Sequence, residues 1–321
     1  ICDKWASHPE MAIELYSLAA EAEGFLGHHS QMESYCDEVL AQKSISTLQK
    51  IHVYLAKLDR MADAELRYED AIHLCLTVLK DLGCRFPRGG VTGLMKAVAS
   101  LNRTVKMVKQ TPTEVFNSMP VATDPTKLAV MALLNRLNYW SYTAGDKYIY
   151  LLILTNSAMN RITLSHGLFE SSACSLSGLG HLSLLVMGNI DTANYVAERA
   201  LKMQEMLQSD AGKVKTFLNL NLFVFPHVKP LPSLSKPFLE GYQSGMRTGD
   251  KDISMWCLFF NITVLYIIGK PLEVIEQQCQ ACNAQMVELK EEDQGSCLRM
   301  HWQLCFNLMG SSNNTVELSG K

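Results

Sequence analysis

The chain has little charge, no apolar run of membrane length and no secretory leader pattern. Charged residues make up 19% of its 321 residues, fewer than the usual quarter, so we expect much buried surface and some apolar surface facing partners. A net charge of −3 excludes a global basic field that would recruit nucleic acid or anionic lipid. The longest apolar run, residues 255–269, is interrupted by Asn261 and Thr263 and is too short for a membrane span. The opening ICDKWASHPEM is charged where a leader would be apolar. We therefore expect a cytoplasmic protein that neither binds nucleic acid nor inserts into a membrane.

Sequence motifs for catalysis, nucleotide binding and metal binding are also missing. The patterns GxxxxGK[ST], GxGxxG and GxSxG do not occur. The ten cysteines lack a disulfide framework spacing, which favours reduced, buried thiols. The formal CxxC from Cys279 to Cys282 lies in a helical pattern without a second pair at zinc spacing, so we interpret both as structural cysteines. We expect no catalytic residue, no cofactor and no metal.

Helical periodicity runs through most of the chain. Strand-like patterning is confined to the short apolar run 220–225. Residues 67–83 place apolar side chains three and four residues apart and end at Gly83, which predicts an amphipathic helix. A second helix is predicted over 124–143, with Asp124 as its N-cap before a proline. Turns between helices are expected at Gly145-Asp146 and Gly249-Asp250, and the prolines of 227–241 should lie before or at the start of a helix.

One spacing pattern recurs along the chain. It consists of a glycine, a packing residue five positions later, and a second packing residue seven positions after the first. The predicted repeat-packing residues are Gly27, Met32, Ala71, Gly188, Ala193, Ala200, Gly269, Val274 and Ala281, and Leu66 stands at the glycine position before Ala71. The anchors at 32, 71, 193 and 274 are about one, three and two periods of roughly 40 residues apart. In a helix–turn–helix repeat the glycine makes the turn and small residues let the next helix approach closely. The pattern predicts an all-α, tetratricopeptide-like right-handed solenoid of antiparallel helix pairs with a period of about 40 residues.

The same pattern predicts the organisation of the chain. We expect a first helical-repeat block at 1–86, an irregular joint with one helix at 87–122, and a second block at 123–310. The helix of the joint is expected at 93–109. Residues 311–321 read as a polar tail, and the start at Ile1 instead of methionine suggests a piece of a longer polypeptide.

With the repeats in place, the chain resembles the long helical-repeat segment of a family of large multidomain signalling proteins. The matching stretches are YCDEVLAQ (35–42), RYEDAIHLCLTVLKDLGCRFP (67–87), ATDPTKLAVMALLNRL (122–137), GNIDTANYVAERALKM (188–203), PLPSLSKPFLEGYQSGMRTGD (230–250) and GKPLEVI (269–275). In that family a serine/threonine-kinase-like module and an AAA/STAND-type ATPase module precede the repeats, and GAF and hybrid histidine-kinase modules often follow. The resemblance implies a cytoplasmic, non-catalytic scaffold between an ATP-dependent switch and an output kinase. The active-site motifs of those modules lie outside these residues, so no catalytic residue is carried over.

We therefore predict an interaction segment that is not itself an enzyme. It would bind a protein, peptide or small effector on a concave face and relay that state to attached ATPase or kinase modules. The candidate partner-binding residues are Tyr54, Lys57, Asn135, Tyr139, Trp140, His181, Asn219 and Trp256. Both tryptophans fit a core position equally well, because large aromatic side chains at helical spacing usually pack inside.

Three alternatives stay open: a free-standing adaptor, a structural spacer, and an α-helical enzyme whose cleft gathers scattered His, Glu and Asp. A strongly shifted carboxyl or imidazole group in a deep pocket would favour the enzyme.

Overall fold

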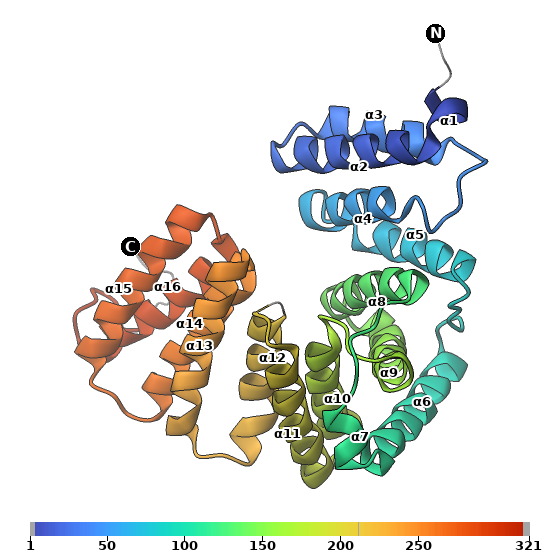
Figure 1. Ribbon diagram of the computed structural model, residues 1–321. Coiled ribbons are helices and arrows are strands. Elements are labelled where there is room, and N and C mark those ends of the chain that lie inside the picture. Colours follow the sequence, from blue (N-terminus) through green and yellow to red (C-terminus); the bar gives the residue numbers. More distant parts are fainter. Residues whose placement is uncertain (1–3, 211, 317–321) are drawn as a thin grey trace. The chain divides into compact units, whose positions relative to one another are not determined.

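In the computed structural model, which describes residues 4–210 and 212–316, every regular element is a helix. The one pairing of extended backbone in these residues is an isolated bridge between Val121 and Leu168. The strand-like run at 220–225 forms a π-helical turn, η3 (Leu220–Val224), instead. Most helices pack against their neighbours in the chain (Figure 1). Among the described helices, none is long and apolar enough to cross a membrane.

The chain divides into two compact units, the first formed by Ile1–Met107 with Met119–Phe169 and the second by Val108–Ser118 with Glu170–Lys321. The helices of unit 1 are α1 (Lys4–Ser7), α2 (Pro9–Phe25), α3 (His29–Leu40), α4 (Ile51–Asp59), the π-helix η1 (Arg60–Ala64), α5 (Tyr68–Asp81), most of α6 (Val91–Gln110), α8 (Pro125–Thr143), the 3-10 turn η2 (Asp146–Tyr148) and α9 (Ile149–His166). Those of unit 2 are α7 (Thr113–Asn117), α10 (Ser172–Met187), α11 (Ile190–Leu207), α12 (Lys213–Asn219), η3, the 3-10 turns η4 (Phe225–His227) and η5 (Leu231–Leu234), α13 (Ser235–Thr248), α14 (Lys251–Ile267), α15 (Leu272–Leu289) and α16 (Glu292–Leu308).

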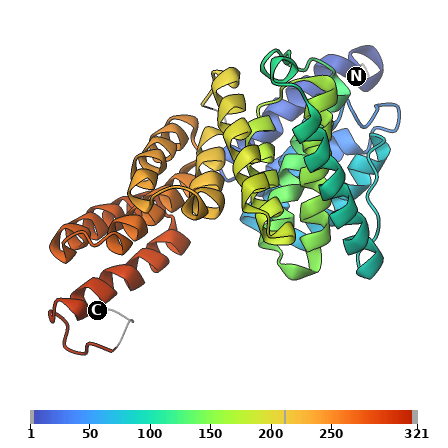
Figure 2. The same ribbon diagram turned by 90° about the horizontal axis from the view of Figure 1, so that it is seen from below.

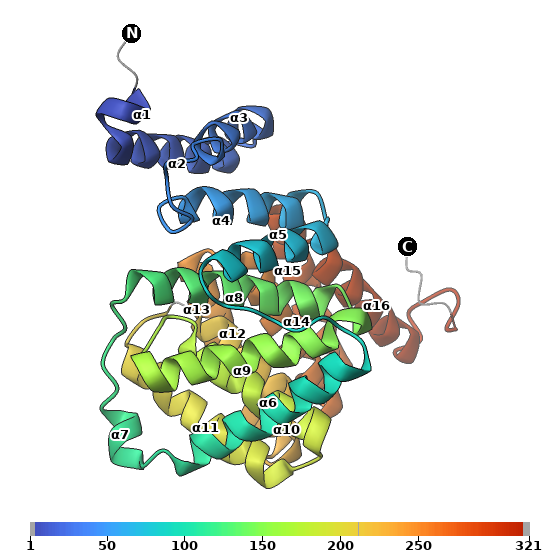
Figure 3. The same cartoon turned by 90° about the vertical axis from the view of Figure 1, so that its right-hand side faces the viewer.

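Unit 1 is built around α8, which packs against both α9 and α5 (Figure 3). The side chain of Asp124 accepts hydrogen bonds from the backbone N–H groups of Thr126 and Lys127 at 2.8 and 3.1 Å, so the predicted N-cap of this helix is confirmed. Gly145 has a positive φ of 84° between α8 and α9, which confirms the predicted turn there. The helix predicted at 93–109 is α6.

Unit 2 contains the helix pairs α10–α11, α13–α14 and α15–α16, which follow one another in chain order (Figure 2). Gly249 has a φ of 83° between α13 and α14, which confirms the second predicted turn. The predicted repeat blocks, including the joint at 87–122, stay a prediction. Residues 317–321 of the predicted tail lie outside the described residues.

The helix following each predicted repeat turn has the same register in three of four cases. Met32 is the fourth residue of α3, Ala71 the fourth of α5 and Ala193 the fourth of α11, and all three are buried. The residue at the turn adopts the left-handed conformation every time, with φ of 79° at Gly27, 61° at Gly188 and 54° at Leu66. Leu66 therefore takes the backbone conformation that glycine provides elsewhere.

Close contact between helix backbones explains why the packing residues are small. A Cβ built on Gly180 of α10 would lie 3.2 Å from the carbonyl oxygen of Ala193 and 3.6 Å from the backbone nitrogen of Ala197 on α11. Gly245 of α13 is tighter still, since its Cβ would lie 3.0 Å from Cγ2 of Val214 on α12. Larger side chains at these sites would force the helices apart.

The fourth repeat turn departs from the prediction. Val274 is 42% exposed and Ala281 is also exposed, so naming them as packing residues was wrong. Lys270 and Pro271 lengthen the turn after Gly269 by one residue, and α15 begins at Leu272. The fourth residue of this helix is therefore Ile275, which is fully buried.

Candidate protein-interaction groove

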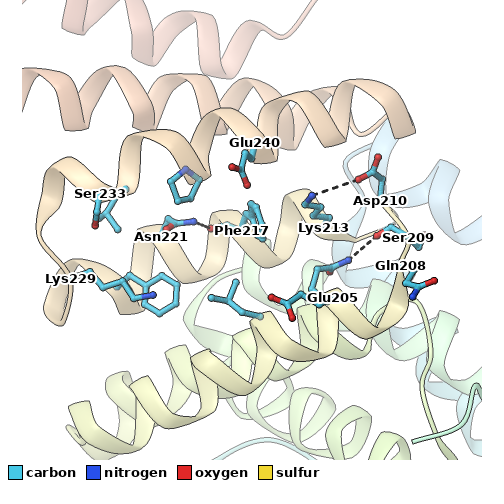
Figure 4. A pocket seen from close by; sticks show the side chains of 15 residues that line it. Glu205, Gln208, Ser209, Asp210, Lys213, Phe217, Asn221, Lys229, Ser233 and Glu240 are labelled. Atoms are coloured by element: carbon cyan, nitrogen blue, oxygen red, sulfur yellow. Dashed lines mark hydrogen bonds and ion pairs between the residues drawn. The ribbon is translucent and has the colours of Figure 1, made fainter. Parts of the chain in front are cut away.

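A pocket of about 770 Å³ lies in unit 2 between α11 and α13 (Figure 4). We call it the α11–α13 groove. Its floor is the continuous stretch of α12, η3 and η4, and its walls are α11 on one side and η5 with the start of α13 on the other. Its lining residues are Leu201, Gln204, Glu205, Gln208, Ser209, Asp210, Lys213, Phe217, Asn221, Phe225, Lys229, Ser233, Leu234, Pro237 and Glu240. The volume lies within the range of ligand pockets, about 300–1,000 Å³.

The floor carries one stripe of side chains spaced four residues apart: Lys213, Phe217, Asn221, Phe225 and Lys229. Lys213 and Phe217 lie on α12, where a spacing of four keeps side chains on one face. Asn221 follows in η3, Phe225 in η4 and Lys229 just after η4. Figure 4 shows Lys213 and Lys229 toward opposite ends, with Phe217 and Asn221 between them. Each lysine Nζ lies over a phenylalanine ring of the stripe, at 5.3 Å from the centroid for Lys213 and 3.5 Å for Lys229. The floor therefore has a phenylalanine on each side of the central Asn221 and a lysine toward each end, and of the two phenylalanines Phe225 is buried.

Asn221 occupies the middle of the floor and is only 3% exposed. Its Nδ2 donates to the carbonyl oxygen of Phe217 at 2.8 Å, whereas its Oδ1 is buried without a hydrogen-bond partner among the described residues. An unpaired buried acceptor costs about 1–3 kcal/mol.

The charged side chains of the groove are held in ion pairs. Asp210 contacts Arg247 at 2.8 Å and Lys213 at 3.9 Å, and the hydrogen bond from Arg247 lowers the pKa of Asp210. Lys229 contacts Glu198 at 2.9 Å. Figure 4 shows Glu205 and Glu240 on opposite walls. The groove thus presents carboxylates on its sides and lysines along its floor.

One end of the groove is held rigid by a hydrogen-bond network. The Nε2 of Gln204 donates to the carbonyl oxygen of Ser209 at 2.9 Å, and its Oε1 accepts from the hydroxyl of Thr216 at 3.2 Å. Both polar atoms of this buried amide are therefore used, the oxygen joining α11 to α12 and the nitrogen binding the segment between them. A preformed groove binds with less loss of conformational entropy than a flexible one.

Four of the predicted partner-binding residues lie on or near the surface of unit 1. Lys57 donates to the Oδ1 of Asp37 at 2.8 Å, Tyr54 and Asn135 are half-buried, and Tyr139 is exposed. Burial raises the pKa of Tyr54. Whether any of the four contacts a partner stays a prediction.

Trp140 was wrongly predicted to face a partner. It is 1% exposed and belongs to the core of unit 1 together with Leu133, Leu137 and Leu151. Because α8 packs against both α5 and α9, its apolar side chains are enclosed on two sides. The alternative interpretation of this tryptophan as a core residue is confirmed.

His181 and Asn219 come together where α10 packs against α12 and η3. The Nδ2 of Asn219 donates to the Oγ of Ser177 at 3.2 Å. The imidazole of His181 stacks on Phe223 with ring centroids 3.9 Å apart and planes inclined by 3°. Burial lowers the pKa of His181 to about 4. These contacts join helices, and neither residue lines the groove.

Trp256 is half-buried in a separate aromatic cluster on α14. Its ring centroid lies 5.7 Å from that of Phe259 and 5.9 Å from that of Phe260. It does not line the groove either, and its contact with a partner stays a prediction.

The groups with shifted pKa values lie outside the groove, apart from Asp210. Burial raises the pKa of Cys279 to about 12 and that of Cys282 to about 11, and both thiols are free. Burial also raises the pKa values of Asp252 and Glu291. No cluster of three or more His, Cys, Asp or Glu side chains that could hold a metal ion occurs in 4–210 or 212–316. The groove lining contains neither histidine nor cysteine, and its side chains offer stacking, hydrogen bonding and ion pairing.

Comparison with protein-family models and with curated proteins found no match.

Reasoning from the sequence missed the groove residues. The signal that could have found them is the spacing of four from Lys213 to Lys229, in which a lysine and a phenylalanine stand on each side of Asn221. The strand-like appearance of LNLFVF hid this stripe, because it interrupts the helical pattern at the centre of the floor.

Proposed function

We propose that this chain is a non-catalytic helical-repeat segment that binds a peptide segment of another protein in the α11–α13 groove. The observation that carries the proposal is the floor of the groove, which combines the partly exposed ring of Phe217 with a lysine toward each end and lies between walls bearing carboxylates. An extended or helical peptide presents apolar side chains and charges along one line, which suits such a floor. The pocket volume is sufficient for several side chains.

The wider role follows from the resemblance of the sequence. We propose that the repeats form a tetratricopeptide-like right-handed solenoid in a cytoplasmic, ATP-dependent signalling protein, and that they relay peptide binding to attached ATPase or kinase modules. The left-handed turns, the small residues between helices and the shared register of α3, α5 and α11 support the repeat.

Peptide selection followed by matched substitutions tests the groove. A displayed library of short random peptides would be selected on the purified chain, and the selected peptides measured by fluorescence anisotropy. Leu201→Arg places a charge in the groove, whereas Leu185→Arg makes the same change on an exposed position of α10 outside it. We expect Leu201→Arg to weaken binding about tenfold or more, which corresponds to about 1.4 kcal/mol. Leu185→Arg should bind as the wild type does.

The proposal fails if no peptide is selected, or if both variants bind the selected peptides equally well. Circular dichroism of each variant separates a lost groove contact from a lost fold. The attached modules are tested separately, by reading the coding sequence on both sides of this segment. A GxxxxGK[ST] loop upstream supports the signalling role, and a start codon directly before Ile1 with a stop codon after Lys321 would instead support a free-standing adaptor.

A further inference from the structure

Two neighbouring helices of unit 1 contain no acidic residue. Neither α6 (Val91–Gln110) nor α9 (Ile149–His166) has an aspartate or glutamate, and none occurs between Asp81 and Glu114. The chain as a whole has a net charge of −3, so this stretch is an exception to the charge balance. Any cation here must find its counter-charge on another element or on a partner.

The outward face of α6 carries three such cations. Lys96, Arg103 and Lys106 are exposed, and none makes an ion pair with a carboxylate in the part of the chain that the structure describes. At 1.5 Å per residue, the line from Lys96 to Lys106 is about 15 Å long. A single small anion would contact only one end of that line.

Arg161 of α9 extends this positive surface into the contact between the two helices. Its Nη1 donates to the Oγ of Ser100 at 2.7 Å and to the Oγ1 of Thr104 at 2.9 Å, both on α6. Both acceptors are neutral hydroxyls, so the half-buried guanidinium has no carboxylate beside it in the described residues. Burial, and then the charge of Arg103, lower the pKa of Arg161. Figure 3 shows α6 lying beside α9.

The remaining nitrogens of Arg161 are open to further contacts. In the described residues its Nε and Nη2 make no hydrogen bond, and neither atom is fully buried. A guanidinium with free N–H groups binds carboxylates strongly, through charge-assisted and often paired hydrogen bonds. A carboxylate placed here would also reduce the repulsion between Arg161 and Arg103.

We propose that Lys96, Arg103, Lys106 and Arg161, here called the basic edge, bind an acidic segment of a protein partner. A peptide with several carboxylates along its length matches a line of cations about 15 Å long. The basic edge belongs to unit 1 and is separate from the groove, which belongs to unit 2.

The packing of α6 argues against a membrane as the occupant. Its apolar face, which includes Ala97, Leu101 and Val105, is buried within the protein and cannot enter lipid. The exposed large apolar residues of α6 are Val91, Leu94 and Met95, all in its first turns. Nucleic acid fits poorly as well, because α6 has no aromatic side chain on which a base could stack.

The test uses the full chain and a fluorescein-labelled oligoglutamate peptide, followed by anisotropy at low ionic strength. We expect the peptide to bind, and Arg103→Gln and Lys96→Gln each to weaken binding about three- to tenfold, as expected for a close charge contact. Lys43→Gln, at an exposed lysine of unit 1 outside the basic edge, should leave binding unchanged. Arg161→Gln should weaken binding at least as much as Arg103→Gln does. Because Arg103 and Lys96 are exposed, replacing them should leave the fold intact, which keeps the test independent of folding.

Salt provides the second measurement. Raising the ionic strength should weaken peptide binding to the wild type and have a smaller effect on a variant lacking Lys96 and Arg103. The proposal is overturned if oligoglutamate does not bind, or if Lys43→Gln weakens binding as much as Arg103→Gln does. It is also overturned if vesicles containing phosphatidylserine or a single-stranded oligonucleotide bind this edge while the peptide does not.

Discussion

Leu66 offers a direct test of whether the repeat turns demand a left-handed residue. It has a φ of 54°, the conformation that Gly27 and Gly188 adopt at the equivalent turns, and its side chain is 68% exposed. A left-handed conformation costs a residue with a Cβ about 1–2 kcal/mol. We therefore expect the variant Leu66→Gly to be more stable than Leu66→Ala by about 1 kcal/mol. Comparing glycine with alanine removes the leucine side chain from both and leaves the backbone as the difference.

The sign of this difference is what distinguishes a left-handed turn from an ordinary helical position. Ala99 lies in the middle of α6 and is exposed, so Ala99→Gly should lower the stability by about 1 kcal/mol. Gly188→Ala should also be destabilising, because its Cβ meets no atom within 4 Å and the cost is conformational alone. A change of 1 kcal/mol corresponds to a shift of about 2–4 °C in Tm for a unit of roughly 150 residues.

Thermal unfolding followed by circular dichroism at 222 nm measures all four variants under the same conditions. Urea titration of the two Leu66 variants gives the free-energy difference independently. If Leu66→Gly is less stable than Leu66→Ala, the turn does not require the left-handed conformation, and the repeat geometry argued from it is wrong.

Three further predictions concern packing, pH and the segment that joins α6 to α7. Gly245→Ala should lower the free energy of unfolding by about 1–3 kcal/mol, because its Cβ would collide with the Oγ of Ser254. Adding Ser254→Ala should restore part of that loss in urea titrations. Full stability of the single variant would contradict the close approach of α13 and α14. Acidification from about pH 6.5 to pH 4 should destabilise the fold by at most about 3 kcal/mol through His181. The imidazole takes up a proton at its ordinary pKa in the unfolded chain, whereas burial lowers its pKa to about 4 in the folded protein. His181→Phe keeps the stack on Phe223 and should flatten this dependence in unfolding curves at pH 7.5 and pH 5, although the buried His301, whose pKa is also lowered, retains some of it. Arg199→Lys should speed the amide hydrogen exchange of residues 108–118, because lysine cannot reproduce the two hydrogen bonds from Arg199 to the carbonyl oxygens of Val108 and Thr111. Unchanged exchange would show that other contacts hold this segment.

The helical character of the chain, and the bounds of a few of its helices and turns, followed from local signals. Asp124 before Pro125 marked the start of α8, because a side-chain acceptor and a fixed φ act on the first turn alone. Gly145 and Gly249 marked turns for a similar reason, since a positive φ is a property of one residue. Such signals need no knowledge of the rest of the fold.

The register of α15 shows where local reasoning ends. Counting from Gly269 placed Val274 and Ala281 in the core, but Pro271 delayed the start of the helix by one residue. A shift of one residue turns a helical side chain by 100°. The buried stripe therefore falls on Ile275 and Cys279 instead.

The sequence by itself determined that the chain is all-helical, where most of its turns lie and which small residues recur, because these depend on periodicity and on single backbone conformations. Only the tertiary structure decided that Trp140 is enclosed in a core, that Lys213 to Lys229 form the floor of a groove, and that Arg161 lies beside Ser100 and Thr104 without a carboxylate. The physical reason is that burial and charge pairing are properties of contacts between helices distant in the chain. A side chain on a helix face becomes core, groove or docking surface according to which other helix packs against that face.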